Sequence, residues 1–569
     1  MAHIHKKIKK GKAYFYYREV GRVHGKTKVL NQVYLGTAEK IKDLVTTNKN
    51  AEVKRLQVQD FGALWVANQI DERVGLVKLI DSLLPRRFKG TSLGEFFLYA
   101  AFNRMIDSKS KRALPEWYDP TAIQFIRPVD LKSLDSHGYH RKWSSVTEED
   151  LQTVAKAFFD KITAAQAQGD GCFLFDTTNF YTFMANKTHS ELARRGKNKE
   201  GRDSLRQIGL ALLVSRHSRL PFHYREYPGN CHDSKVFSTL LAELVGAMRA
   251  SGNHDLTLVI DKGMNSPDNF KVIDDISDVH FITTYSPSHA ESLAMASRKK
   301  FTFVKTPHNI ALQENNQFED CITVWRTQGE YWGRERTVLV TYNPRTARKQ
   351  QYSLDQKLLK IQLELFEMRA KVNAGARDWK NEGDVRRRYA NFCDELYMPD
   401  DHFELHFKSL HGKLTMSFNK NFHRIKKYTE KFGKNILITD REDWSTEEIV
   451  QAALDRYLVE EAFRQSKDDD LVTMAPIRHW TDTTIRCHFF CCVIALTYLR
   501  ILELILKEKG FEITADRCMD IMRKLRSCVY WSDQKTMKIN RKIEVPTPEQ
   551  AAILQVFGFQ IVDGVLQKT

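Results

Sequence analysis

The chain has 569 residues, with 88 Lys and Arg against 71 Asp and Glu, so its formal net charge is +17. A chain of this length exceeds what one hydrophobic core supports and should divide into roughly three or four domains. Its 42% hydrophobic content is that of a globular protein, and the basic excess indicates a polyanionic partner, most simply nucleic acid.

Cysteine usage and hydropathy exclude several other classes of protein. None of the nine cysteines forms a CxxC pair with zinc-finger spacing, so we expect reduced, mostly buried thiols in a cytosolic protein. The first twelve residues are basic without an apolar segment, which predicts no signal peptide. The longest apolar stretch, residues 489–506, contains Arg500 and Glu503. It therefore predicts a buried helix, with no membrane span and no membrane partner.

Two regions precede the part of the chain that carries candidate chemistry. Residues 1–50 read as a basic β-hairpin module, which either contacts DNA phosphates or is a sheet edge protected by lysines. Residues 51–168 show apolar side chains at i, i+3 and i+4, which predicts a helical domain that helps to bind DNA ends.

The periodicity changes at Gly171, where apolar strands begin. Residues 169–286 predict the order strand, strand, strand, helix, strand, helix, strand, with the first three strands as a meander. This order is typical of an α/β fold with a mixed sheet. Residues 287–440 then predict a mainly β insertion domain, in which residues 301–313 are one of the expected strands and which also contains one long charged helix.

Two isolated aspartates interrupt apolar strands in the α/β region. Asp176 lies in CFLFDTTNF and Asp261 in LTLVIDKGM. An aspartate that stops an apolar strand is expected at the end of that strand. Each could simply cap the following turn, as Asp often does. Two of them, followed by a glutamate on a helix, favour a metal site instead.

That glutamate lies on a helix predicted from Ile449 to Lys467, within a segment, residues 441–510, that returns to the α/β domain. Neither Gly nor Pro interrupts it. At 100° per residue, one stripe carries Glu460 with Arg456, Arg464 and Lys467. A solvated face with i,i+4 ion pairs is the ordinary alternative. The neighbouring Glu461 points about 100° away and is the weaker candidate.

Three carboxylates from separate segments suit a pair of Mg²⁺ ions, because Mg²⁺ prefers oxygen ligands. Two such ions can activate an attacking oxygen and stabilise the leaving oxygen of a phosphodiester. Arg464 and Lys467 suit phosphate. The sequence has no phosphate-binding loop of the GxxxxGK[ST] type, so ATP is not implied.

These residues resemble the DDE transposases of bacterial insertion sequences. The resemblance rests on Asp176 in LFDTTNFY, Asp261 in VIDKGMNS and Glu460 in RYLVEEAFRQSK. One branch of that family has an insertion domain before its glutamate. Its signature is Tyr, two residues, Arg, three residues, Glu, six residues, Lys. Arg456, Glu460 and Lys467 fit this spacing, whereas Ala453 stands at the Tyr position.

The resemblance implies an RNase H-like core interrupted by a β-rich insertion. It implies Mg²⁺-dependent cleavage at the element's terminal inverted repeats, with two ions and Mn²⁺ as a substitute, followed by strand transfer to target DNA. Asp176, Asp261 and Glu460 correspond to the metal ligands, and Arg456 and Lys467 to contacts with phosphate and the DNA end. A homodimer on paired ends, a hairpin intermediate and a cytoplasmic, nucleoid-associated location are also implied.

Two other interpretations remain open from the sequence. The chain could be a non-catalytic, sequence-specific DNA-binding protein derived from a transposase, or an RNase H-like nuclease without strand transfer. Residues 511–569 form a C-terminal region without an assigned role. Arg478 and His479 in APIRHW could contact DNA, although a packed loop histidine is the commoner case.

Overall fold

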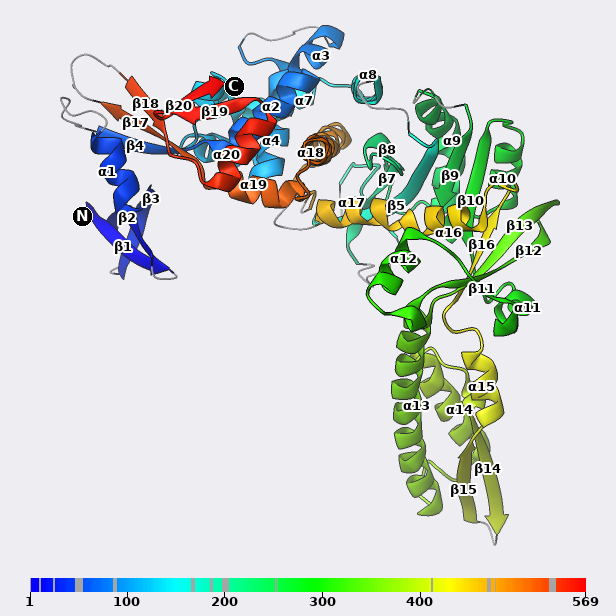
Figure 1. Cartoon of the computed structure of the whole chain (residues 1–569). Helices are drawn as coiled ribbons and strands as arrows, with labels where there is room; N and C mark the ends of the chain where they lie inside the picture. Colours follow the sequence, from blue (N-terminus) through cyan, green and yellow to red (C-terminus); the bar gives the residue numbers. More distant parts are fainter. Residues whose placement is uncertain are drawn as a thin grey trace. The chain divides into compact units, whose positions relative to one another are not determined.

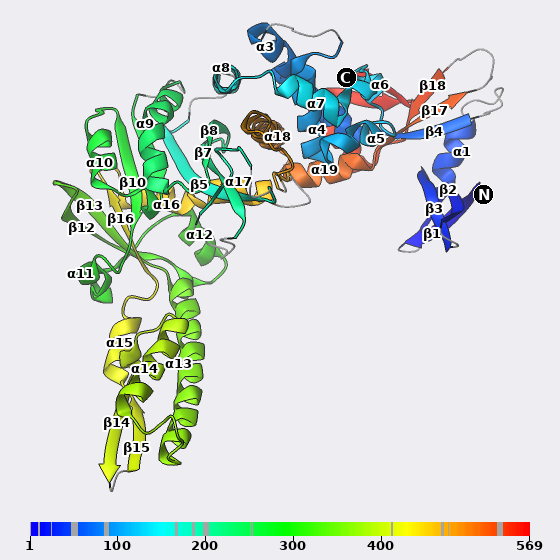
Figure 2. The same cartoon turned by 180° about the vertical axis from the view of Figure 1, so that it is seen from behind.

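We describe a computed structural model of the chain, which divides into two compact units (Figures 1 and 2). Unit 1 comprises residues 1–254 and 457–569, and unit 2 comprises residues 255–456. Each unit is described by itself. The structure describes all residues except 1, 10–11, 24–25, 47–54, 85–89, 165–168, 185–187, 197–203, 251, 253, 411–412, 468–471, 476 and 532–538.

The N-terminus of unit 1 is an antiparallel sheet of the strands β1 (Ala2–Lys9), β2 (Lys12–Val23) and β3 (Lys26–Gly36). The two predicted strands correspond to β2 and β3. The Lys-rich opening run also forms a strand, which pairs with β2 from Ala2 to Lys9. Tyr16 and Tyr34 pack across β2 and β3 with their ring centroids 5.2 Å apart, so aromatic contacts stabilise this small sheet.

A helical core follows in unit 1, and its central element comes from the far end of the chain. Helix α18 (Asp482–Glu508) packs against α2 (Gly62–Val74), α4 (Leu93–Ile106), α7 (Ser136–Trp143) and α8 (Glu148–Ala164). Among the described helices, α18 alone is long and apolar enough to cross a membrane. However, 83% of its apolar window is buried inside the protein. The prediction of a buried helix agrees with this packing.

The sheet of unit 1 is an antiparallel meander. It is built from β5 (Cys172–Thr182), β7 (Arg206–Ser215) and β8 (Pro221–Pro228), with the short β6 (Arg194–Arg195) also beside β7. Helix α9 (Asp233–Arg249) follows and buries its apolar side on the unit's core.

Unit 2 contains a mixed sheet. In it β9 (Leu256–Ile260) and β10 (Val279–Tyr285) are parallel and are connected through α10 (Pro267–Asp274). Antiparallel strands continue from β10 as β16 (Lys434–Thr439), β13 (Arg334–Tyr342), β12 (Thr323–Tyr331) and β11 (Thr302–Phe303). From β5 to β10 the order of the main elements is the predicted one, and the mixed α/β prediction is confirmed.

The predicted insertion contains more helix than expected. Its lobe comprises α13 (Pro344–Asn373), α14 (Glu382–Glu395), α15 (Phe422–Thr429) and the hairpin of β14 (Phe403–Leu410) with β15 (Lys413–Lys420). It extends away from the strands of unit 2 (Figure 1). Leucines and other apolar residues of α13 recur at helical spacing and form a core of their own against α14 and β15.

Two further predictions about local structure were wrong. Residues 301–313 were expected to be a strand, but only Thr302 and Phe303 are extended. Thr306 caps α12 (Pro307–Glu314), whose proline occupies the first turn. The helix predicted from Ile449 to Lys467 is two helices, α16 (Thr446–Asp455) and α17 (Tyr457–Lys467).

The break between these helices falls at Arg456. This residue keeps right-handed helical dihedrals of φ −53° and ψ −27°. Its guanidinium lies 3.5 Å from the Asp261 carboxylate in the same unit. No glycine or proline marks the break, so helix propensity alone could not predict it. Because α16 belongs to unit 2 and α17 to unit 1, the break is also the boundary between the units.

Candidate active site

Asp176 lies within β5 and not at its end, contrary to prediction. Residues 172–175 are buried, whereas Asp176 to Asn179 are half-buried. The strand continues because Asp176 pairs in register with Leu212 of β7. Its Oδ1 accepts a hydrogen bond from the Thr177 backbone N–H at 2.8 Å. This half-buried carboxylate is therefore held by a strand that pairs with β7 both before and after Asp176.

Glu460 lies in the first turn of α17, which packs against β5 within unit 1. Leu458, Val459 and Phe463 are buried and anchor the helix, whereas Glu460 is exposed. Tyr457, three residues before Glu460, is 53% exposed. The exposed face of α17 therefore presents Glu460 from an anchored helix.

Asp261 directly follows the fully buried strand β9 and begins a short 3-10 helix, η3 (Lys262–Met264). Its Oδ1 accepts a hydrogen bond from the Thr284 hydroxyl at 3.1 Å and lies 3.5 Å from Arg456 Nη1. Thr284 Oγ1 in turn accepts a hydrogen bond from the Lys262 N–H. Asp261 is thus at the end of its strand, as predicted, and β10 fixes its position.

The three predicted phosphate contacts differ in what surrounds them. Arg456 pairs with Asp261, and its side chain is only 21% exposed. Arg464 is 68% exposed and lies 3.6 Å from Glu461, which is the acid judged the weaker candidate. Lys467 is the last residue of α17, but its side chain lies outside the described residues.

The structure thus places the predicted residues as two sets. Asp176 and Glu460 belong to elements of unit 1 that pack together, and Asp261 and Arg456 are in contact within unit 2. The carboxylate oxygens suit Mg²⁺ in type, because a hard cation prefers such ligands. Among the described residues, no group of three or more His, Cys, Asp or Glu side chains is placed so that it could hold a metal ion.

Sequence reasoning missed two polar residues that hold segments distant along the chain together, one of which contacts Asp261. Thr284 on β10 contacts both Asp261 and the backbone of the loop that follows it. Asp482, at the start of α18, accepts hydrogen bonds from the Ser190 hydroxyl and the Glu191 N–H, and thereby fixes the segment after β5. No sequence pattern marks these contacts, because they join segments that are distant along the chain.

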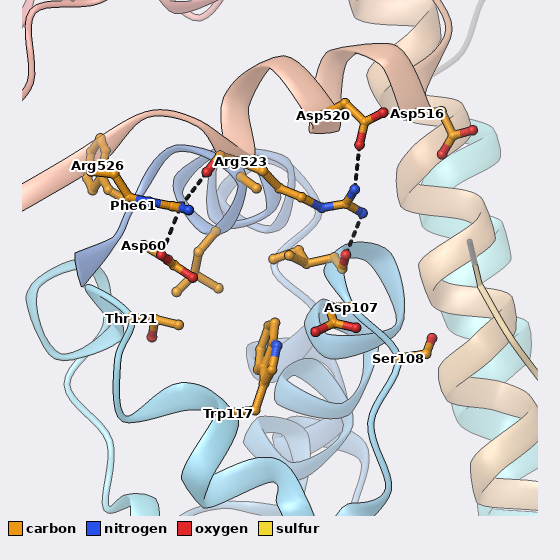
Figure 3. A pocket seen from close by; sticks show the side chains of 13 residues that line it. Asp60, Phe61, Asp107, Ser108, Trp117, Thr121, Asp516, Asp520, Arg523 and Arg526 are labelled. Carbon is orange, nitrogen blue, oxygen red and sulfur yellow. Dashed lines mark hydrogen bonds and ion pairs between the residues drawn. The ribbon is translucent and has the colours of Figure 1, made fainter. Parts of the chain in front are cut away.

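The helical part of unit 1 contains a cavity. It has a volume of about 700 Å³ and is bordered by Asp60, Trp117 and the helix α19 (Ala515–Arg523), as Figure 3 shows. Arg526 pairs with Asp60 at 2.8 Å, and Arg523 pairs with Asp520. Both arginines of this lining are therefore paired with an aspartate.

Comparison with known families identifies the family of this chain. Residues 168–496 match the family described as "Transposase DDE domain". The chain belongs to this DDE transposase family, because the match covers more than half of its length. The matched segment contains Asp176, Asp261 and Glu460.

Comparison with solved structures gives a weak similarity. One match is the cryo-EM structure of a piggyBac transposase synaptic complex with hairpin DNA, at 10% sequence identity and a TM-score of 0.36. The match covers 83% of this chain and 82% of that chain. No curated protein matches the chain.

Proposed function

We propose that this protein is a transposase that cleaves DNA at the ends of an insertion sequence and transfers the strands to target DNA. The observation that carries the proposal is the family match over residues 168–496, which contains all three predicted carboxylates. The net charge of +17 supports it, because the substrate is a polyanion.

In this proposal Asp176, Asp261 and Glu460 hold two Mg²⁺ ions, which Mn²⁺ can replace. When bound, such ions activate the attacking oxygen and stabilise the leaving oxygen of the phosphodiester. The chain's own contribution is to hold the carboxylates on hydrogen-bonded or packed elements. Arg456, Arg464 and Lys467 contact DNA phosphates, Arg through its planar fork and Lys as a point charge.

Finer assignments also belong to the proposal. Arg456, Glu460 and Lys467 fit the signature of the bacterial insertion-sequence branch, with Ala453 as a departure from its Tyr. Exposed Tyr457 lies one turn further on and is available for the same task. We propose a homodimer acting on paired terminal inverted repeats in the bacterial cytoplasm, with cleavage by way of a hairpin.

The test is a cleavage assay on DNA that carries the terminal repeats flanking the gene, with Mg²⁺ or with EDTA. We expect Mg²⁺-dependent cleavage at a defined position by the wild-type protein. The variants Asp176→Asn, Asp261→Asn and Glu460→Gln should lose it, while their binding to the same DNA persists.

Glu461→Gln is the matched control, because Glu461 lies on the same helix and forms an ion pair with Arg464. It should retain cleavage. Full cleavage by Glu460→Gln would overturn the assignment of the third carboxylate. Binding without cleavage by the wild type would favour the DNA-binding protein, and cleavage without products joined to a target duplex would favour the nuclease.

A further inference from the structure

A second cavity in the helical part of unit 1 has an unusual charge distribution. Its volume is about 650 Å³, and it lies between α4, α7 and the segment before α18. Among the described residues, its lining contains no Asp or Glu but several cationic side chains: Arg104, Lys109, Lys111, Arg112 and Arg478. A cavity of this size accommodates a small ligand, and its lining would attract an anion.

Among these side chains, Lys111 gives the strongest indication that the cavity binds an anion. It begins the 3-10 helix η1 (Lys111–Ala113) and is only 6% exposed. Its Nζ has no hydrogen-bond partner among the described residues. Burial, together with the nearby Arg104, lowers its pKa to about 8, so it remains mostly protonated at pH 7. A buried cation without a hydrogen-bond partner is costly, and an anion in the cavity would offset that cost.

Arg104 also favours an anion in the cavity. Its Nη1 donates to the Thr473 carbonyl at 2.7 Å and its Nη2 to the Lys109 carbonyl at 3.3 Å. Its Nε is buried without a partner among the described residues. Neutral carbonyls orient the guanidinium but do not neutralise it. Lys109, by contrast, already pairs with Asp107 at 2.9 Å.

Aromatic side chains complete the cavity. Lys111 Nζ lies 5.2 Å from the ring centroid of Trp143 and 5.5 Å from that of Tyr139. Trp480 also borders the cavity and is 62% exposed. His479 is neutral at pH 7, because burial, with Lys111 and Arg104 nearby, lowers its pKa to about 3. Cations beside an exposed aromatic ring are the usual means of binding a phosphate next to a base.

The cavity of Figure 3 provides an internal comparison. It belongs to the same unit and has a similar volume, but its arginines pair with aspartates. Unpaired cations are therefore not a general property of cavities in this helical core.

We propose that the cavity around Lys111 binds a nucleotide at a DNA end, with Lys111 and Arg104 holding its phosphate and Trp480 stacking on its base. The identification of the nucleotide as part of DNA rests on the proposed function. The cationic lining rests on the structure alone.

The test measures equilibrium binding of the full-length protein by fluorescence anisotropy in EDTA. The probes are two 3′-labelled single-stranded hexanucleotides of one sequence, one with a 5′-phosphate and one with a 5′-hydroxyl. We expect the phosphorylated strand to bind about tenfold or more tightly, as charged hydrogen bonds warrant. Lys111→Met should abolish the difference. The exposed Arg478→Gln should reduce it without affecting folding.

Lys142→Met is the matched control, since Lys142 is also a buried lysine, 3% exposed, but lies outside the cavity lining. It should keep the full preference. Equal binding of the two strands, or a preference that survives in Lys111→Met, would overturn the proposal. Inorganic phosphate competing as strongly as the phosphorylated strand would overturn the assignment to a nucleotide.

The assay also separates this inference from the proposed function. Binding is measured without metal, and Glu460→Gln should bind like the wild type. A protein that prefers the 5′-phosphate but never cleaves DNA would overturn only the proposed function. A protein that cleaves but shows no such preference would overturn only this inference.

Discussion

Thr284 shows how one hydroxyl can position a candidate metal ligand. It donates to Asp261 and accepts from the Lys262 N–H. Thr284→Val keeps the shape but loses both hydrogen bonds. We expect it to lower the free energy of unfolding by about 1 kcal/mol and the cleavage rate about tenfold or more, as is common for residues that orient ligands. Urea unfolding and the cleavage assay measure these effects, and an unchanged cleavage rate would contradict the role.

His280 is expected to make the stability of unit 2 depend on pH. A hydrogen bond with Asp440, at 2.9 Å, raises the pKa of His280 above its ordinary value of 6.5. Its contribution to stability is therefore fully present below pH 6.5 and is lost as the pH rises through the folded-state pKa. Urea unfolding of the wild type and His280→Gln from pH 5.5 to 8.5 should show a difference that shrinks with rising pH. A difference in the free energy of unfolding that stays constant or grows with rising pH would contradict this role of His280.

At the scale of elements, α13 separates buried from exposed leucines within one turn. Leu365 is fully buried in the core of the insertion lobe, whereas Leu363 is 57% exposed. Leu365→Ala should destabilise the lobe by about 2–5 kcal/mol, and Leu363→Ala should change it by less than about 0.5 kcal/mol. Hydrogen exchange of the backbone amides in α13 and β15 measures both. Equal effects would mean that the lobe has no independent core.

The sequence predicted the elements in which buried apolar residues recur at the spacing of a strand or a helix. The strands β5, β7, β8, β9 and β10 were recovered because each contains several buried apolar residues at the spacing of a strand. The break at Arg456 was missed because a contact with Asp261, not propensity, accompanies it.

The candidate site was predicted as a set of residues and not as an arrangement. Asp176 and Asp261 stand out as lone acids in apolar runs, and Glu460 stands out because it shares a helical stripe with basic residues. The cavity around Lys111 could not be predicted, since its lining comes from two stretches more than three hundred residues apart. In the sequence, Lys111 is an ordinary lysine of a polar loop.

At the scale of the whole molecule, the net charge of +17 should make binding to DNA strongly salt-dependent. Release of counterions from about 6–10 phosphates lowers affinity about 10³–10⁵-fold between 50 and 200 mM salt. Anisotropy with a duplex unrelated to the element's ends measures this non-specific component. A dependence close to zero would contradict the view that the basic excess serves binding to nucleic acid.

Because unit 1 is built from two separate chain segments, its fold can be completed only late in synthesis. Its helices α2, α4, α7 and α8 are synthesised early, whereas α18, which packs against all four, is completed only at residue 508. At about 5–20 residues per second, roughly 340 residues of synthesis after α8 correspond to about 20–70 s. Throughout this interval the surface that α18 will cover is open to chaperones and proteases. Slow codons before residue 457 should therefore lower the yield of folded protein more than slow codons after residue 508.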